Sequence, residues 1–227
     1  MPAGPRGAAR ARTLTVNELL ALSDYRNDVS RIYHDVRGRI DEGDPRDAHR
    51  IWRERRDELW RTHDASPVPA AKRDEWKGLQ YWDYDPNYAF EVPFDAVAPL
   101  EGRDEPTDTV VLTGHKGPWG EVFPAAVLDT PLGQIYAMWM VQYGGGLFVA
   151  FKDQTNGNDT YGGGRYLLDG PKGAWLGAVD DRVRIDLNFA YHPSCARSPE
   201  WNCPLALEPP LPTRVEAGER LERPAWS

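Results

Sequence analysis

The sequence predicts a mainly β protein of the α+β class, in which an N-terminal helical arm packs on an antiparallel curled sheet or barrel-like sandwich. Three observations predict this fold. Apolar residues recur near the 3.6-residue helical period only before about residue 65. Beyond Tyr81, short runs rich in β-branched and aromatic residues alternate between apolar and polar positions. The Gly, Pro, Asp and Asn clusters between these runs leave no room for crossover helices, so the strands should be antiparallel.

The first helix of the arm should begin after Thr15, because Glu18 three residues later completes a capping-box pattern. Gly43 should end this helix. Its periodic apolar positions are Leu19, Leu22, Val29, Ile32, Val36 and Ile40. A second helix should open at Asp44-Pro45, since proline is well tolerated at the first helical position, and run to about Thr62. Its expected buried residues are Ile51, Trp52, Leu59 and Trp60.

The strands should follow the arm closely. Phe90, Val92 and Phe94 alternate with polar residues. The clearest strands are expected at 108–113, 121–128, 134–142, 146–152, 164–168, 183–190 and 213–216. The expected organisation is a disordered tail at 1–13, a helical arm at 14–65 and a β-rich domain at 66–227.

The charge balance argues against nucleic acid as a partner. The chain has 27 Lys and Arg against 35 Asp and Glu, a formal net charge of −8, whereas a nucleic-acid binder needs a basic face. A basic cluster in the second helix is interleaved with acidic residues, which indicates a solvated face. This cluster comprises Arg53, Arg55, Arg56 and Arg61 among Glu54, Asp57 and Glu58.

The sequence also predicts a cytoplasmic protein without a membrane partner. No apolar stretch approaches the roughly 20 residues of a membrane span, and residues 1–13 have no apolar region of a secretory signal. With two cysteines and no export signal, the expected compartment is the reducing cytoplasm.

The segment from Phe151 to Tyr166 has a structural and a functional interpretation. In the structural one, Asn156-Gly157 forms a type I′ hairpin turn, and Asp153, Thr155 and Thr160 satisfy the turn backbone. In the functional one, Gly162 to Gly164 let a molecule approach the backbone closely, and Arg165 binds its carboxylate or phosphate. The match to a calcium loop or a phosphate-binding glycine loop is poor.

A second segment, Asp186 to Cys195, brings two polar residues to one face. Asp186 and Asn188 are two residues apart in an expected strand, so their side chains point the same way. If this face is buried, the two groups need partners, and Arg165 is the expected cation. Such a buried ion pair is either purely architectural or part of a ligand site.

His192, Cys195 and Cys203 allow three interpretations. The cysteines are structural thiols, or the three residues bind zinc, or a cysteine is a nucleophile with His192 as its base. The metal signal is weak, because one His-x-x-Cys and one further Cys fall short of paired Cys-x-x-Cys motifs. A disulfide is disfavoured in the expected cytoplasmic location.

Several ordered motifs resemble one family. Phe151–Leu167 contains an aromatic-Lys-Asp run followed by Thr-Tyr-Gly-Gly-Gly-Arg-Tyr-Leu, and Asp186–Cys195 reads Asp-x-Asn-x-Ala-Tyr-His-Pro-x-Cys. Cys203-Pro204 and the Ala-Gly-Glu of Ala217–Glu219 follow. With these motifs the chain resembles the bacterial and archaeal family of domain of unknown function 1684. Further matches lie at Ser66-Pro67, Gly78-Leu79 and Tyr84-Asp85-Pro86.

The resemblance covers most of the chain from about Ile51 onward, and the first fifty residues lie outside it. It implies a site near these motifs but no particular reaction. Two departures are visible. The chain has Arg197 after Cys-Ala, where the family usually has Tyr, and Glu208-Pro209-Pro210-Leu211 where the family usually has Pro-Glu-Asn-Arg-Leu.

The leading functional hypothesis is a pocket, of an enzyme or a binding protein, for a small polar or anionic ligand. No cofactor is identified. Candidate catalytic residues are Asp153, Asp186, His192 and Cys195, and candidate ligand-binding residues are Arg165, Tyr161, Tyr166, Asn188, Thr155 and Asp159. One alternative is a non-catalytic module whose arm docks a partner or a second copy of the chain as a homo-oligomer. Another is a metal-assisted hydrolase or lyase at His192, Cys195 and Cys203.

Overall fold

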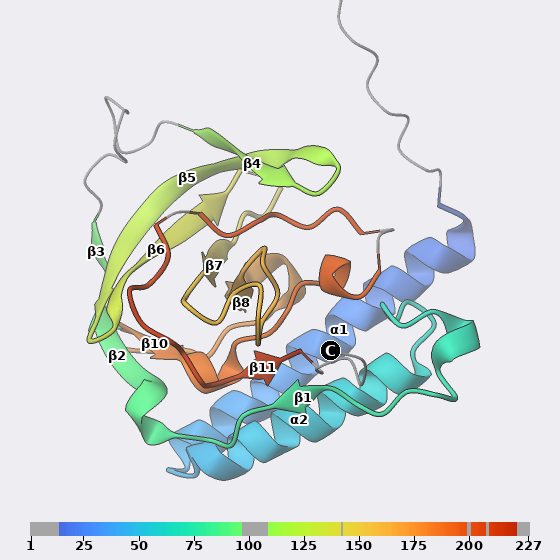
Figure 1. Cartoon of the computed structure of the whole chain (residues 1–227), viewed down its shortest axis with the longest axis horizontal. Helices are drawn as coiled ribbons and strands as arrows, with labels where there is room; N and C mark the ends of the chain where they lie inside the picture. Colours follow the sequence, from blue (N-terminus) through green and yellow to red (C-terminus); the bar gives the residue numbers. More distant parts are fainter. Residues whose placement is uncertain (1–13, 97–108, 142, 199–200, 208, 222–227) are drawn as a thin grey trace, which may run out of the picture.

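A computed structural model of the chain describes residues 14–96, 109–141, 143–198, 201–207 and 209–221. The expected tail at 1–13 lies outside these residues. Two long helices precede three antiparallel sheets, so the predicted mainly β, α+β fold is confirmed. The largest sheet is curled, and within the described residues none of the three closes on itself. Figure 1 shows the long strand β5 curving over one side of the molecule and the helices lying along the opposite side. Within the described part of the chain, no helix is both long and apolar enough to cross a membrane.

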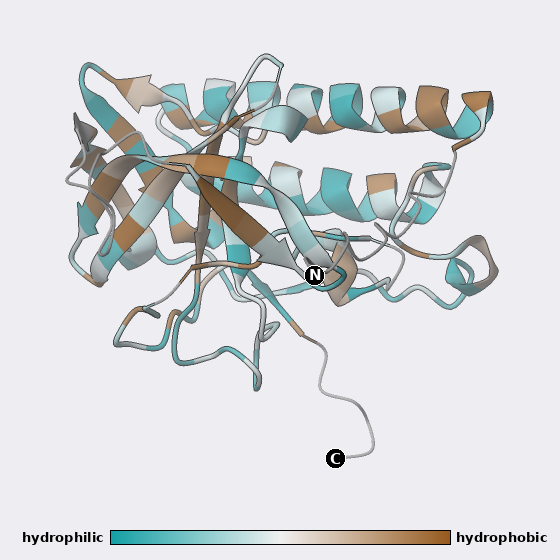
Figure 2. Ribbon diagram, turned by 90° about the horizontal axis from the view of Figure 1, so that it is seen from above, coloured by the Kyte–Doolittle hydropathy of each residue, from teal (hydrophilic) through white to brown (hydrophobic). Residues whose placement is uncertain are grey.

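The two helices form a hairpin that begins and turns as the sequence predicts. Helix α1 spans Val16–Asp41, and the capping box of Thr15 and Glu18 is present at its start. Helix α2 spans Pro45–Thr62, with Asp44 as its N-cap. Gly43 connects them with a φ of +87°, a value that favours glycine. The helices run side by side, and each alternates between hydrophobic and hydrophilic positions (Figure 2).

The strands form three sheets of different size. The six-stranded sheet has the order β3(Asp95–Ala96), β5(Gly117–Thr130), β6(Gly133–Met140), β7(Leu147–Phe151) and β8(Arg165–Asp169), with β4(Val110–Gly114) paired to β5. The second sheet has the order β2(Ala89–Pro93), β10(Arg182–Asp186) and β9(Ala178–Val179). The smallest pairs β1(Gln80–Tyr81) with β11(Glu219–Arg220). Short 3₁₀ helices punctuate the loops: η1(Ala70–Lys72), η2(Pro86–Tyr88), η3(Gly170–Lys172), η4(Leu187–Phe189) and η5(Ser194–Ala196).

The helices and the sheets share one hydrophobic core. Trp52 of α2 is fully buried, and its ring lies 5.3 Å from those of both Tyr81 in β1 and Phe189 in η4. On the other side of the hairpin, Gly173 packs so closely on α1 that an added Cβ would lie 2.8 Å from the Cβ of Ser30. Arg37 of α1 also donates a hydrogen bond to the carbonyl of Trp175 at 2.7 Å. The arm is therefore an integral wall of the core.

Three local predictions are wrong, two of them because side-chain hydrogen bonds replace a regular backbone pattern. The strand expected at 183–190 ends at Asp186, whose carboxylate caps the η4 turn by accepting from the N–H of Asn188. The segment 213–216 is not a strand, because its backbone bonds to buried side chains. Asn156-Gly157 is not a type I′ turn. Such a turn needs a positive φ at both central residues, and among the described non-glycine residues only Asp180 has one.

Candidate functional site

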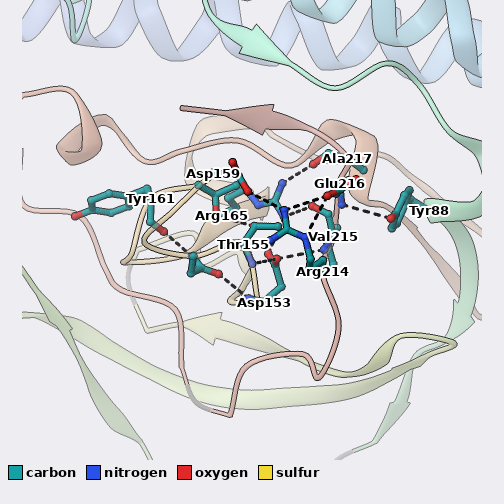
Figure 3. Close-up of polar contacts among 12 residues, drawn as sticks. Tyr88, Asp153, Thr155, Asp159, Tyr161, Arg165, Arg214, Val215, Glu216 and Ala217 are labelled. Carbon is teal, nitrogen blue, oxygen red and sulfur yellow. Dashed lines mark hydrogen bonds and ion pairs between the residues drawn. The ribbon is translucent and has the colours of Figure 1, made fainter. Parts of the chain in front are cut away.

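Arg165 forms the centre of a closed cluster of polar groups. Its side chain is fully buried, and Nη2 donates to Oδ2 of Asp153 at 2.7 Å and to the carbonyl of Val215 at 2.9 Å. Nη1 donates to the carbonyl of Ala217, whereas the buried Nε has no partner among the described residues. The other carboxylate oxygen of Asp153 accepts from the backbone N–H of Thr155 at 2.8 Å and of Val215 at 3.2 Å. Figure 3 shows these bonds tying the 153–165 loop to the C-terminal segment.

The remaining polar residues of this loop also bond to one another. The hydroxyls of Thr155 and Thr160 lie 2.9 Å apart in the interior, and Asp159 pairs with Arg214 at 2.7 Å on the surface. The expected close approach to the glycine run is present, but it comes from the chain itself. A Cβ on Gly164 would lie 2.5 Å from that of Ala206 and 2.8 Å from the carbonyl oxygen of Phe151. Thr155, Asp159 and the glycine run, which the sequence analysis assigned to a ligand, are therefore bonded to or packed against the chain itself.

Asp186 and Asn188 do converge, but their partners differ from the expected one. The carboxylate of Asp186 accepts from the side chain of Asn188 at 2.7 Å and from the hydroxyl of Tyr84 at 3.2 Å. Asn188 also exchanges two hydrogen bonds with the backbone of Asp85, at 2.8 and 2.9 Å. The expected ion pair with Arg165 is therefore wrong. Burial raises the pKa of Asp186 to about 6, while the bonds from Asn188 and Tyr84 oppose this rise.

His192 is held in one tautomer by two neighbours. Its Nδ1 lies 3.1 Å from Oε1 of Glu219, and its Nε2 accepts from the backbone N–H of Tyr161 at 3.2 Å. Because Nε2 accepts a hydrogen bond, it carries no hydrogen, so the ring is neutral and Nδ1 is protonated. Burial lowers the pKa of His192, which keeps the ring neutral. Both nitrogens are engaged, so in this arrangement His192 positions Glu219 and the loop and is not free to act as a base.

The two cysteines lie together, whereas the described residues contain no arrangement of three His, Cys, Asp or Glu side chains suited to a metal ion. Cys195 is half-buried and Cys203 is buried; both are free thiols. The hydroxyl of Tyr161 lies 3.7 Å from Sγ of Cys195. Tyr166 is fully buried and donates its hydroxyl to the carbonyl of Pro204. The grouping of His192 with both cysteines therefore has no metal-binding geometry here.

A cavity lies where the helical hairpin covers the β-rich region, and we call it the arm pocket. Its volume is about 30 Å³, on a scale where roughly 10–15 Å³ holds one water molecule. Helices α1 and α2 form one wall, and η3 with the 191–194 segment forms the other. The lining residues are Tyr25, Val29, Ile32, Tyr33, Arg56, Leu59, Trp60, Lys172, Tyr191, His192 and Ser194.

Two cations line the arm pocket, each held by a carboxylate that does not line it. Arg56 is buried and donates to Glu219 at 3.1 and 3.2 Å and to the hydroxyl of Tyr81 at 2.7 Å. Lys172 pairs with Asp169 at 2.8 Å. Burial alone would lower the pKa of Lys172, but the Asp169 carboxylate raises it above its usual value, so the ammonium stays charged.

The carboxylate of Glu219 pairs with Arg56 and His192, which line the arm pocket, and with Arg197, which does not. Burial favours its protonation, but His192, Arg56 and Arg197 together hold the pKa of Glu219 well below its usual range. Arg197 lies 3.4 Å from the same carboxylate. Around the pocket, Arg56, Arg197 and Lys172 thus pair with the carboxylates of Glu219 and Asp169, and the Asp57 carboxylate is also within electrostatic reach of Arg56.

Tyr33, which lines the arm pocket, has a buried hydroxyl for which the described residues provide no partner in hydrogen-bond geometry. Burial raises the pKa of Tyr33, and the indole N–H of Trp52, itself without such a partner, lies close enough to oppose that rise. A buried hydroxyl without a partner is costly, so a polar occupant of the pocket would stabilise it.

Of the polar residues at the arm pocket, sequence reasoning named His192 as a candidate but missed Arg56, Lys172 and Glu219, although two signals were available. The charged cluster of α2 was interpreted as a solvated face, but Arg56 lies four residues from both Trp52 and Trp60 and so shares their buried face. The second signal is the Ala-Gly-Glu motif at Ala217–Glu219, which ends in the carboxylate that pairs with Arg56. Lys172 carries no local signal, because its place under α1 depends on long-range packing.

Comparisons with known proteins agree with the motif resemblance. The sequence profile of a family described as "Protein of unknown function (DUF1684)" matches residues 74–220. The solution NMR structure of an uncharacterised protein from Haloarcula marismortui is similar at 30% sequence identity with a TM-score of 0.51, covering 74% of this chain and 90% of that chain. A comparison with curated proteins finds no match. The profile begins after α2, so the arm contributes its wall of the pocket from outside the matched region. The chain belongs to the DUF1684 family of proteins of unknown function.

Proposed function

We propose that this protein binds a small anion, or the anionic end of a small polar molecule, in the arm pocket. The observation that carries the proposal is that the charged side chains lining the pocket are positive. Arg56 and Lys172 supply positive charge, and among the described residues no Asp or Glu lines the pocket. Ligand pockets combine apolar walls with a few such polar groups, and charge-assisted hydrogen bonds are the strongest of these contacts.

The proposed ligand is of the class expected from the sequence, a small anion or polar molecule, but its proposed site is the arm pocket and not Arg165. Arg165 was expected to hold the anion, but its two Nη groups already bond to Asp153, Val215 and Ala217, and it does not line the cavity. Arg56 has a carboxylate partner as well, yet it also borders a cavity. The small volume favours a carboxylate or a simple oxyanion. The unpartnered Tyr33 hydroxyl would be the donor that completes its coordination.

Calorimetric titration tests this proposal with formate, acetate, bicarbonate, sulfate and phosphate at constant ionic strength. At least one anion should bind in a saturable manner. Lys172→Met should weaken its binding by about tenfold or more, because a hydrogen bond to a charged group contributes roughly 1.5–3 kcal/mol. Lys72→Met is the matched control, since Lys72 is exposed on η1 and does not line the pocket; its affinity should stay within about twofold.

Two outcomes would contradict the proposal. One is that none of the five anions binds more strongly than chloride does. The other is that the Lys172 and Lys72 variants lose affinity equally, which would indicate general screening of charge. If Lys172→Met does not fold, Tyr33→Phe replaces it, because loss of an unpartnered hydroxyl leaves the apo fold intact.

A second candidate function, self-association through the arm, rests on exposed apolar residues at the start of α1. Most of the arm's apolar stripe packs inside the chain, but Val16, Leu19 and Leu20 are 71%, 51% and 60% exposed. Figure 2 shows this end of α1 in brown. We propose a second copy of the chain as the occupant. Leu20→Ser should then lower the mass measured by light scattering at high concentration, whereas Val111→Ser on β4 should not. A wild-type protein that stays monomeric at every concentration removes this candidate.

The other expectations, a cytoplasmic location and the absence of nucleic-acid and membrane partners, stay predictions. The acidic charge balance supports them.

A further inference from the structure

We propose that Cys195 and Cys203 form a thiol–disulfide exchange site, in which Cys195 attacks a small disulfide and Cys203 resolves the resulting adduct. This site lies outside the arm pocket, and nothing in the proposed anion binding requires it. The proposal starts from the unequal surroundings of the two thiols.

The two cysteines differ in accessibility as an attacking and a resolving thiol should. Cys195, on η5, is half-buried, so a solvent-borne molecule can reach its sulfur. Cys203 is only 7% exposed, and its thiol interacts with that of Cys195. Reactive cysteines occupy partly exposed positions with groups that stabilise the thiolate, whereas buried cysteines are inert towards external reagents. Attack on an external disulfide should therefore begin at Cys195.

The thiols are held together by two independently anchored segments. Cys203 precedes Pro204, which pairs with Gly114, and follows Asn202, whose side chain accepts from the N–H of Lys116 at 2.9 Å. Cys195 lies within the η5 turn, where the N–H of Arg197 bonds to the carbonyl of Ser194 at 3.0 Å. The backbone next to each cysteine is therefore held by hydrogen bonds of its own.

The immediate environment favours a thiolate on Cys195. Its pKa is lowered to about 7, first by a hydrogen bond from the Cys203 thiol and then by the charge of His115, against the opposing effect of burial. The hydrogen bond with Cys195 and burial raise the pKa of Cys203. The Tyr161 hydroxyl lies 3.7 Å from the Cys195 sulfur, and its ring is 5.6 Å from that of His115. An attacking thiol is most effective when its pKa is near the ambient pH.

The exchange balances without a metal or another cofactor. The Cys195 thiolate attacks one sulfur of a disulfide RSSR, a bond forms between Cys195 and that sulfur, and RS⁻ leaves and takes up a proton. Cys203 then loses its proton to solvent and attacks the sulfur of Cys195. The second RS⁻ leaves, and Cys195–Cys203 is oxidised to a disulfide while RSSR is reduced to two RSH.

The test uses reduced full-length protein and glutathione disulfide, followed by acid quenching and mass spectrometry. The wild type should become two hydrogens lighter and accumulate little glutathione adduct. Cys203→Ser should instead accumulate the mixed disulfide on Cys195. Cys195→Ser should react at least about 100-fold more slowly, because the remaining thiol is buried.

A second measurement separates a functional pair from two neighbouring structural thiols. The rate of Cys195 alkylation by iodoacetamide should rise with a midpoint near pH 7 in the wild type. In Cys203→Ala the midpoint should move up towards the ordinary value of about 8.5, because the thiol donor is lost. Cys203→Ser keeps a hydroxyl donor and should fall between them.

Three results would overturn the proposal: a stable glutathione adduct on wild-type Cys195, equal reactivity of the two thiols, or an alkylation midpoint that does not respond to Cys203→Ala. Should a serine or alanine variant not fold, peptide mapping of briefly alkylated wild-type protein gives the decision. Modification of Cys203 as fast as Cys195 would then refute the assigned roles.

Discussion

The two buried arginines, Arg165 and Arg56, occupy regions that look alike in composition and differ in what surrounds them. Each pairs with a carboxylate inside the protein, at 2.7 Å for Arg165 with Asp153 and 3.1 Å for Arg56 with Glu219. Around Arg165, backbone carbonyls accept from both Nη groups and join the loop to the C-terminal segment. Around Arg56, the neighbouring atoms leave a cavity with an unpartnered tyrosine hydroxyl.

The comparison shows that a buried cation is not in itself a ligand site. Each region holds one described buried polar group without a partner, Nε of Arg165 in one and the hydroxyl of Tyr33 in the other, so what distinguishes them is that a cavity borders Arg56. A closed network specifies a conformation, and breaking it leaves an uncompensated charge. An incompletely satisfied pocket can accept a ligand, because a bound polar molecule supplies the missing hydrogen bonds. The following substitutions test this difference.

The largest expected effect is that of Arg165→Ala. It should lower the free energy of unfolding by about 3–5 kcal/mol, because Asp153 would keep a buried charge with no cation. Chemical denaturation measures this loss. Arg214→Ala is the matched control: its side chain is exposed, and the change should cost about 1 kcal/mol or less. Equal losses in the two variants would show that the Arg165 cluster does not stabilise the fold.

Gly164→Ala should also be strongly destabilising, by about 3 kcal/mol, because the closed region is packed against the glycine run. Gly164 has a φ of +96°, and the new Cβ would meet Phe151 backbone and Ala206. Gly162→Ala, two residues earlier, would meet only the Cα of Gly157 at 4.0 Å and should change stability by about 0.5 kcal/mol or less. The difference between their thermal midpoints is the readout; similar midpoints would contradict the tight packing.

Asp186→Asn tests a buried carboxylate that has no cation. The folded pKa of about 6 lies above the unfolded value, so ionised Asp186 costs stability at pH 7. This cost disappears as the pH falls through the folded pKa towards about 4. Wild type should therefore gain about 2 kcal/mol relative to Asp186→Asn between about pH 7.5 and 4. Tyr84→Phe, which removes a donor to Asp186, should move the transition to higher pH. A pH-independent difference would refute the raised pKa.

The smallest effect is expected at the arm pocket itself. Without an anion, Tyr33→Phe should leave stability unchanged or raise it by up to about 1 kcal/mol, because the hydroxyl has no partner among the described residues. Tyr81→Phe should have the opposite sign, since that hydroxyl accepts a 2.7 Å bond from Arg56. Thermal denaturation compares the two. A large loss in Tyr33→Phe would show that the hydroxyl is already satisfied.

Part of the candidate site could be anticipated from local sequence. The close approach to the glycine run and the convergence of Asp186 with Asn188 both occur. Their partners could not be derived, since Ala206 and Tyr84 are brought there by the folded chain. The expected strand at 213–216 failed for the same reason: its residues suit an extended backbone, but Asp153 and Arg165 bond to it in place of a neighbouring strand.

By itself, the sequence determined the local elements of this protein: the capping box at Thr15, the turn at Gly43 and the alternation that makes the second part β-rich. These depend on neighbours a few residues apart, where backbone preferences and periodicity act. Only the tertiary structure decided that Arg56 meets Glu219, 163 residues away, and that Lys172 lies under the helices. Such pairs depend on how whole elements pack, and the space left between them is a property of the packed chain.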